Sequence, residues 1–233
     1  MLDQNLELLF KNSIIDVTGE VSWPFQDEGK SKRIGGFAHG SGGIAYSLFK
    51  AARKLGNDKI LNFAKGALAH DRTFYDKDIE GWRDMREEND MIDSTAWCHG
   101  SSGIGLSRVL ISQYYHDDLL EKEISIAKNN ILKNGFLDNQ CICHGDLGNL
   151  EILKIINNYE KDFQLNNHIY NYIHSLCLQY EKGIKFQCGD GGKMELLGLF
   201  MGLSGFAYQM IRFYNWDETP SLLCLETPIK TKL

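Results

Sequence analysis

The sequence feature that most constrains the fold is a Gly-x-x-Gly motif that occurs four times along the chain. The four segments read GFAHGSGGIAYSL, AWCHGSSGIGLSR, CICHGDLGNLEIL and GLFMGLSGFAYQM, and they begin at residues 36, 96, 141 and 198. The first glycines of successive motifs, at positions 40, 100, 145 and 202, are 60, 45 and 57 positions apart. A motif that recurs at such spacing predicts an array of similar supersecondary units.

Apolar residues around the motifs have helical spacing. They are Ile44, Leu48, Ala51 and Leu55 after the first motif, and Phe206, Met210 and Phe213 after the fourth. A second helical pattern lies between motifs, at Ile60, Ala64 and Ala67, then Leu120, Ile124, Ala127 and Ile131, then Ile169, Ile173, Leu176 and Tyr180. Short polar links such as LGNDK at 55–59 join the two patterns, so we expect an all-α fold of helical hairpins.

An aromatic residue precedes each motif and completes the proposed repeat. Trp23, Trp82 and Phe186 lie 16 to 18 positions before the first glycine of their motif, and Phe136 lies 9 positions before Gly145. We expect these side chains to anchor a loop that leads into each helix.

Composition excludes several classes of function. The formal charge is −6, with no basic block, which argues against a nucleic-acid partner. No signal peptide and no membrane-spanning apolar run are visible. With 233 residues and 43% hydrophobic content the chain can form one sizeable core or two small domains. Its six cysteines are too sparse for a disulfide scaffold, which predicts a reducing, cytoplasmic location.

The side chains just before the glycines carry the chemical signal. If the four turns gather at one end of the array, these side chains gather with them, and Cys and His in a reducing compartment favour Zn²⁺. No local Cys-x-x-Cys pair exists, so the ligands would come from different repeats. Two alternatives stay open, namely packed residues without a metal and a Cys141–Cys143 chelate. The side chains that lie one or two positions before the first glycines are His39, Cys98, His99, Cys143, His144 and Met201.

The segments AHG, WCHG, CHG and GLSG, in this order and spacing, resemble the lanthionine synthetase C-like (LanC) family. The ending PSLLCLE at 220–226 is similar to the C-terminus of class II (LanM-type) lanthionine synthetases. The resemblance implies an α/α-toroid of about seven hairpins, of which roughly four are present here. Residues 1–233 would then form the C-terminal portion of a LanC-like cyclase domain, without the aspartate of an earlier repeat that this family uses.

The resemblance also implies an active site. It makes Cys98, Cys143 and His144 the zinc ligands and His39 the catalytic residue, with Cys141 a bystander. The implied reaction adds cysteine thiols of a dehydrated precursor peptide to dehydroalanine or dehydrobutyrine, which closes thioether rings in lantibiotic-type peptides. A dehydratase domain or subunit is the implied partner. His99 is expected to be a pocket wall or a structural hydrogen-bonding residue.

Two other functions remain open at this point. One is a LanC-like protein that binds glutathione or adds it to dehydrated residues, and the other is a non-catalytic, zinc-stabilised helical fragment. The remaining cysteines, Cys177, Cys188 and Cys224, lie outside the motifs, and we expect them to be buried as small hydrophobic residues.

Overall fold

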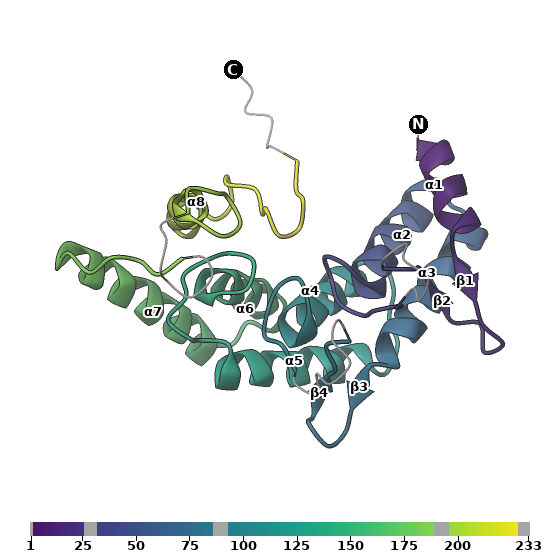
Figure 1. Cartoon of the computed structure of the whole chain (residues 1–233), viewed down its shortest axis with the longest axis horizontal. Helices are drawn as coiled ribbons and strands as arrows, with labels where there is room; N and C mark the ends of the chain where they lie inside the picture. Colours follow the sequence, from purple (N-terminus) through teal and green to yellow (C-terminus); the bar gives the residue numbers. More distant parts are fainter. Residues whose placement is uncertain (1, 26–31, 86–92, 189–195, 228–233) are drawn as a thin grey trace. The chain divides into compact units, whose positions relative to one another are not determined.

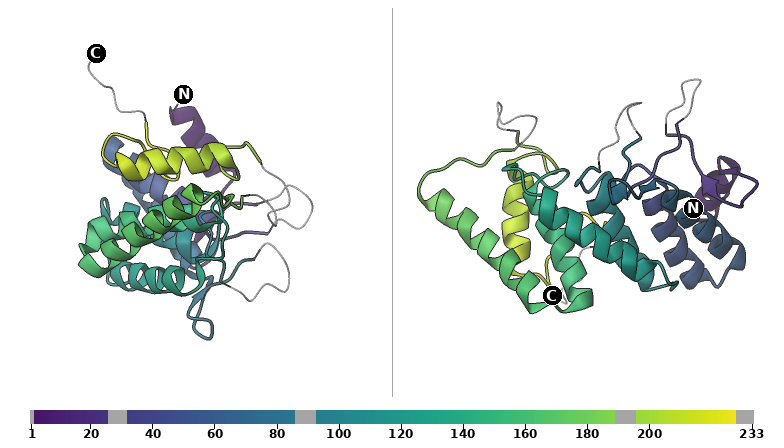
Figure 2. Two further views of the ribbon diagram at one scale, coloured as in Figure 1. Left: turned by 90° about the vertical axis from the view of Figure 1, so that its left-hand side faces the viewer. Right: turned by 90° about the horizontal axis from the view of Figure 1, so that it is seen from below.

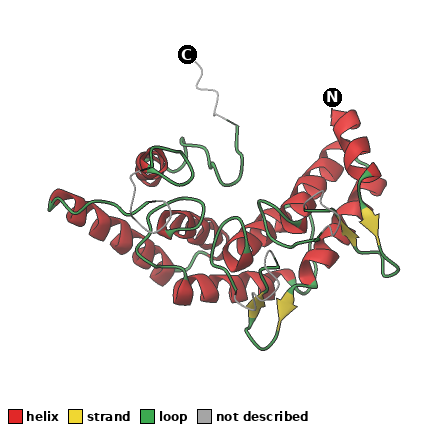
Figure 3. Cartoon of the chain, viewed as in Figure 1, coloured by secondary structure: helices red, strands yellow, loops and turns green. Residues whose placement is uncertain are grey.

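Helices carry the fold. The computed structural model describes residues 2–25, 32–85, 93–188 and 196–227 (Figures 1 and 3). Its helices are α1 (Leu2–Lys11), α2 (Ser41–Leu55), α3 (Asp58–Arg72), α4 (Gly100–Ser112), α5 (Leu120–Asn134), α6 (Asp146–Glu160), α7 (Phe163–Glu181) and α8 (Leu203–Tyr214). The predicted all-α class is confirmed. Within the described part, no helix combines the length and the apolar character that crossing a membrane requires.

Two short antiparallel ribbons interrupt the helices. Strand β1 (Ile14–Ile15) pairs with β2 (Val21–Ser22), and β3 (Tyr75–Asp76) pairs with β4 (Gly81–Trp82). The sequence does not predict these strands, because two-residue strands are too short to show an alternating pattern. The second ribbon holds one of the expected aromatic anchors, since Trp82 is only 1% exposed.

The chain divides into two compact units, residues 1–130 and 131–233. In the first unit α2 and α3 form a helical hairpin and lie side by side (Figure 2). Gly56 ends α2 with a left-handed φ of 61°, and the Asn57 side chain caps α3 by accepting from the amides of Lys59 and Ile60. The predicted link at 55–59 is therefore a hairpin turn.

The core of the first unit lies between α2, α3 and the neighbouring α4. The predicted positions of α3 are all buried, but those of α2 were partly wrong, since Leu55 is 43% exposed. Because α2 packs on both α3 and α4, the buried face of α2 is shifted by one residue from the face that the sequence predicts. The core residues are Ala45, Leu48, Phe49, Ala52, Ile60, Ala64, Ala67, Leu68, Ile111 and Leu120.

In the second unit α6 packs on α7 and is its most buried helix. On α7 the predicted positions Ile169 and Leu176 are buried, whereas Tyr180 is 65% exposed. On α8 the predicted apolar face, Phe206, Met210 and Phe213, is only half-buried. The fully buried positions are polar, because α8 packs on a buried carboxylate of α6. They are Gln209 and Arg212, beside Gly205.

Candidate functional site

Each of the four motifs forms the same junction between a loop and a helix. Gly40, Gly145 and Gly202 are the N-cap residues of α2, α6 and α8, and His99 is the N-cap of α4 directly before Gly100. All four N-caps have an extended backbone, and none caps its helix with a side chain. The predicted register of the repeat is therefore correct.

The loop before each helix folds back over the helix N-terminus. Amide groups at the start of the helix donate to carbonyl oxygens seven positions earlier, which satisfies donors that would otherwise lack a partner. Ser41, Asp146 and Leu203 donate to Ile34, Asn139 and Leu196 at 3.1, 2.6 and 2.8 Å, and the second glycines Gly43, Gly103 and Gly148 donate to Gly36, Ala96 and Cys141 at 3.2, 3.1 and 3.5 Å.

This wrapping requires glycine. A Cβ atom at the second glycine of each motif would fall far inside van der Waals contact with the carbonyl oxygen six positions earlier. The pairs are Gly43 with Phe37, Gly103 with Trp97, Gly148 with Ile142 and Gly205 with Leu199. The glycines therefore serve close approach of the backbone.

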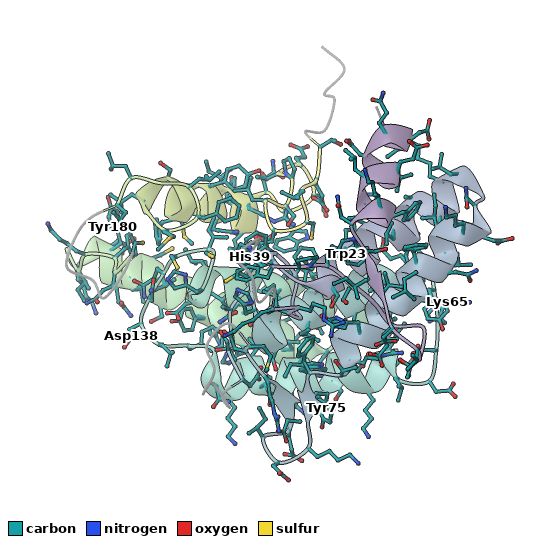
Figure 4. All side chains as sticks on the ribbon, turned by 45° about the vertical axis from the view of Figure 1, so that its right-hand side comes forward. Trp23, His39, Lys65, Tyr75, Asp138 and Tyr180 are labelled. Carbon is teal, nitrogen blue, oxygen red and sulfur yellow. The ribbon has the colours of Figure 1, made fainter. Side chains whose placement is uncertain are left out.

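In the first unit, the loops of the first two motifs lie against each other. The exposed His39 ring stacks on the buried His99 ring, with centroids 5.2 Å apart and an interplanar angle of 24°. Phe25 packs edge-on with the His39 ring, with ring centroids 5.9 Å apart. Gly36 has φ +104°, and a Cβ there would lie 3.0 Å from the Cys98 carbonyl oxygen. The predicted acid His39, labelled in Figure 4, and the loop of the predicted ligand Cys98 are thus neighbours.

His99 also lines a small pocket on the same unit. The pocket walls include Phe74, Trp82 and Arg83, together with the backbone at Gly35 and Gly36. The location agrees with the expectation that His99 is a pocket wall. Its stacking on His39 was not predicted, because the repeat pattern shows which residues share a register but not which rings meet.

In the second unit, Cys143 and His144 occupy the same register as Cys98 and His99. Both are half-buried and lie directly before the N-cap of α6. The amides of Ile142 and Cys143 both donate to the Phe200 carbonyl at 3.0 Å, so the third loop is fixed to the loop of the fourth motif.

A buried carboxylate braces this third loop. The Asp146 carboxylate accepts from the Leu137 amide at 3.0 Å and from the Tyr172 hydroxyl at 2.6 Å. Burial raises the pKa of Asp146, although its hydrogen bonds act in the opposite direction. Burial, together with the Asp146 contact, also raises the pKa of Tyr172, so the phenol keeps the proton that it donates.

All six cysteines lie in the described residues, and none forms a disulfide. Burial and the nearby Cys141 raise the pKa of Cys188 to about 11, and burial raises that of Cys224 to about 12. These two thiols are buried, as expected. Cys177 is exposed, so the prediction that it is buried was wrong. It lies one position beyond the buried Leu176, about 100° around α7.

The predicted metal ligands are drawn from both units. Cys98 belongs to the first unit, and Cys143 and His144 belong to the second. Among residues 2–25, 32–85, 93–188 and 196–227, no group of three His, Cys, Asp or Glu side chains is gathered around a common point. The donors nevertheless fit zinc in chemical type, with two thiols and one imidazole at matching loop positions.

Comparison with known proteins identifies relatives of the chain. Residues 2–224 match the family described as lanthionine synthetase C-like protein. The chain is 32% identical over 194 residues to the lacticin 481/lactococcin biosynthesis protein LcnDR2 of Lactococcus lactis subsp. lactis, which covers 77% of this chain and 20% of that protein. Among solved structures, nisin cyclase matches with a TM-score of 0.62 and 21% identity, over 79% of this chain and 47% of the other.

The chain therefore spans about a fifth of LcnDR2 and just under half of nisin cyclase. The likeness to nisin cyclase shows the fold, which is the helical class of the α/α-toroids expected from the sequence.

Proposed function

Since the chain belongs to the lanthionine synthetase C-like family, we propose that it serves zinc-dependent closure of thioether rings in a peptide. The substrate would be a dehydrated precursor peptide of the lantibiotic type, in line with the names of LcnDR2 and nisin cyclase. A dehydratase would supply the dehydroalanine or dehydrobutyrine residues. The reaction needs reduced thiols, so we place it in the cytoplasm.

Cys98, Cys143 and His144 would hold the zinc ion. Three protein ligands leave a fourth position open, which is typical of catalytic rather than structural zinc sites. Zinc bound there would lower the pKa of a substrate cysteine thiol, which makes the thiolate available at neutral pH.

His39 would act as the general acid. When the thiolate sulfur of the substrate cysteine bonds to the β-carbon, the π electrons of the carbon–carbon double bond move to the α-carbon. The adjacent carbonyl delocalises them, which gives an enolate. The α-carbon then takes one proton, which replaces the proton that the thiol has lost. His39 is exposed and can approach a bound peptide, and the stacked His99 ring restrains the plane in which it lies.

The observation that carries this proposal is the shared loop register of the four motifs. It places Cys98–His99 and Cys143–His144 at equivalent positions before α4 and α6, with His39 at the same position before α2. A repeat used only for packing requires the glycines, but it does not require Cys and His beside them. Packing alone therefore does not account for this recurrence.

The function is tested with the zinc-loaded chain and a synthetic peptide that carries one cysteine and one dehydroalanine. Remaining thiols are counted by alkylation and mass spectrometry. His39→Asn should slow ring closure by about 10²–10⁴ while the zinc content stays unchanged. His168→Asn is the matched control, since His168 is an imidazole that packs on Phe136 in the second unit. Equal rates for the parent and His39→Asn would remove His39 from the mechanism.

A further inference from the structure

A buried carboxylate outside the motifs reaches the loop that carries His39. Asp71 lies in the last turn of α3 and is 0% exposed. Its Oδ1 atom accepts from the Gly36 amide at 2.8 Å and from the Ser41 hydroxyl at 3.4 Å. These two residues flank His39 on either side. The carboxylate fixes the Gly36 end of the segment directly and lies near the Ser41 end, where the Ser41 hydroxyl is also 3.0 Å from His70 Nδ1.

The loop is shaped to admit this carboxylate. A Cβ atom at Gly35 would lie 3.0 Å from Asp71 Oδ1, and a Cβ at Gly42 would lie 3.0 Å from Oδ2. Both distances are tighter than ordinary contacts, so larger residues at these positions would press on the carboxylate. Gly35, before the first motif, and Gly42, inside it, therefore leave the space that the Asp71 carboxylate occupies.

The other carboxylate oxygen is fixed by α4. Asp71 Oδ2 pairs with Arg108 Nη1 at 2.8 Å, and Arg108 is completely buried. Arg108 is held in turn by Glu123 of α5, whose Oε2 accepts from Arg108 Nε at 3.0 Å. The position of Asp71 is thus determined from outside the His39 loop.

The same helix α4 begins at the loop of Cys98 and His99. Asp71 therefore links the loop of His39 to the helix that carries its stacking partner, His99. A buried ion pair costs desolvation free energy when it forms, and a shift of one partner leaves the other buried charge without compensation. The link resists small displacements of His39 relative to His99.

We propose that Asp71 is a positioning residue, which sets the His39 ring against His99 in the geometry needed for proton delivery. The inference rests on the proposed function for its catalytic consequence. Its structural part, the placement of the His39 ring by Asp71, is measured independently of ring closure.

The test compares Asp71→Ala and Asp71→Asn with the parent chain by NMR of the histidine Hε1 protons. Stacked aromatic rings shift the signals of the protons that face them, so the His39 signal reports its contact with His99. Asp71→Ala should move this signal toward the value of a histidine that is not stacked on another ring. Asp71→Asn keeps an oxygen for the Gly36 amide and should give a smaller change. The His168 signal, from the second unit, should not move.

Asp117→Asn is the matched control. Asp117 pairs with Arg72 at 2.7 Å in the same unit, and the side-chain oxygen that accepts from the amides of Leu119 and Leu120 is kept in the amide. Asp117 is part-exposed and makes no direct contact with the His39 loop, but its partner Arg72 also pairs with Glu123, the partner of Arg108. The variant therefore shows whether a change elsewhere in the same charge network, without the Asp71 contacts, moves the His39 signal. It should leave the His39 signal and ring closure unchanged.

With the dehydroalanine peptide, Asp71→Ala should lower kcat about tenfold or more, with KM and zinc content unchanged. Folding is checked by circular dichroism, and if the alanine variant is unfolded, Asp71→Asn decides. An unmoved His39 signal in a folded Asp71 variant would overturn the proposal. A moved signal supports the positioning even if the zinc-loaded parent closes no ring, a result that would remove the proposed function instead.

Discussion

The two units bury an arginine between helices in the same way but connect it to different parts of the chain. In the first unit, Arg108 of α4 pairs with Asp71, which holds the His39 loop. In the second unit, Arg212 of α8 pairs with Glu151 of α6 at 2.8 Å, and Glu151 also accepts from the Ser221 hydroxyl at 2.5 Å. The buried ion pair therefore holds the candidate catalytic loop of His39 in the first unit, and the segment around Ser221 in the second.

The loops themselves are also braced differently. The carboxylate that holds the His39 loop is paired with a cation, whereas Asp146, which holds the Cys143–His144 loop, accepts from the neutral Tyr172 hydroxyl and the Leu137 amide. A metal ion would itself fix its ligands, whereas a proton donor has to be positioned by protein contacts alone. Under the proposed roles of the two loops, the buried ion pair is found at the loop whose proton donor needs positioning by protein contacts.

The largest effect that separates the two units should come from the buried arginines. Arg212→Met and Arg108→Met each leave a buried carboxylate without its arginine, which costs about 3–5 kcal/mol of unfolding free energy. Only Arg108→Met should move the NMR signal of His39. Urea unfolding measures the first quantity and the Hε1 spectrum the second. A shift of the His39 signal in Arg212→Met would contradict the conclusion that only the first unit's buried arginine is connected to the His39 loop.

The junction that both units share should respond equally in both. Gly43→Ala in the first unit and Gly148→Ala in the second force a Cβ against a backbone carbonyl, and each should cost about 3 kcal/mol. Gly198→Ala is the control, because a Cβ there meets nothing within 4 Å and its φ is not in the left-handed region. Denaturant midpoints measure the losses, and a tolerated Gly148→Ala would show that the third loop is not wrapped like the first.

A smaller effect concerns the second motif, whose helix α4 is braced by Asp93. Its carboxylate accepts from the Ser101 amide at 2.9 Å and from the Asn130 amide group at 3.0 Å. Burial raises the pKa of Asp93 above its ordinary value of 3.8 despite these bonds. The folded state therefore favours the protonated acid, and this contribution to stability is present below pH 3.8 and is lost as the pH rises through the raised pKa.

Asp93→Asn removes this titration. The parent should lose stability relative to the variant as the pH rises from about 4 toward neutrality, which urea unfolding at several pH values measures. A stability difference that stays constant over this range, or grows in favour of the parent, would contradict the assignment.

The sequence was sufficient to predict the helical class, the hairpin link at 55–59 and the register of all four junctions. These features depend on short-range patterns, namely glycine spacing and apolar periodicity. The buried polar face of α8 was missed, because Gln209 and Arg212 look like solvent-facing residues until Glu151 is placed beside them. Asp71 was missed for the same reason, since its partners lie 35 positions before it and on the following helix.

The central claim is that equivalent loops of both units supply the ligands of one zinc ion. It is tested most directly by elemental analysis of the purified full chain and of single alanine variants. We expect close to one zinc per chain in the parent and in Cys141→Ala, and a loss of most of the metal in Cys98→Ala, Cys143→Ala and His144→Ala. Full zinc retention in Cys143→Ala, or loss of the metal in Cys141→Ala alone, would contradict it.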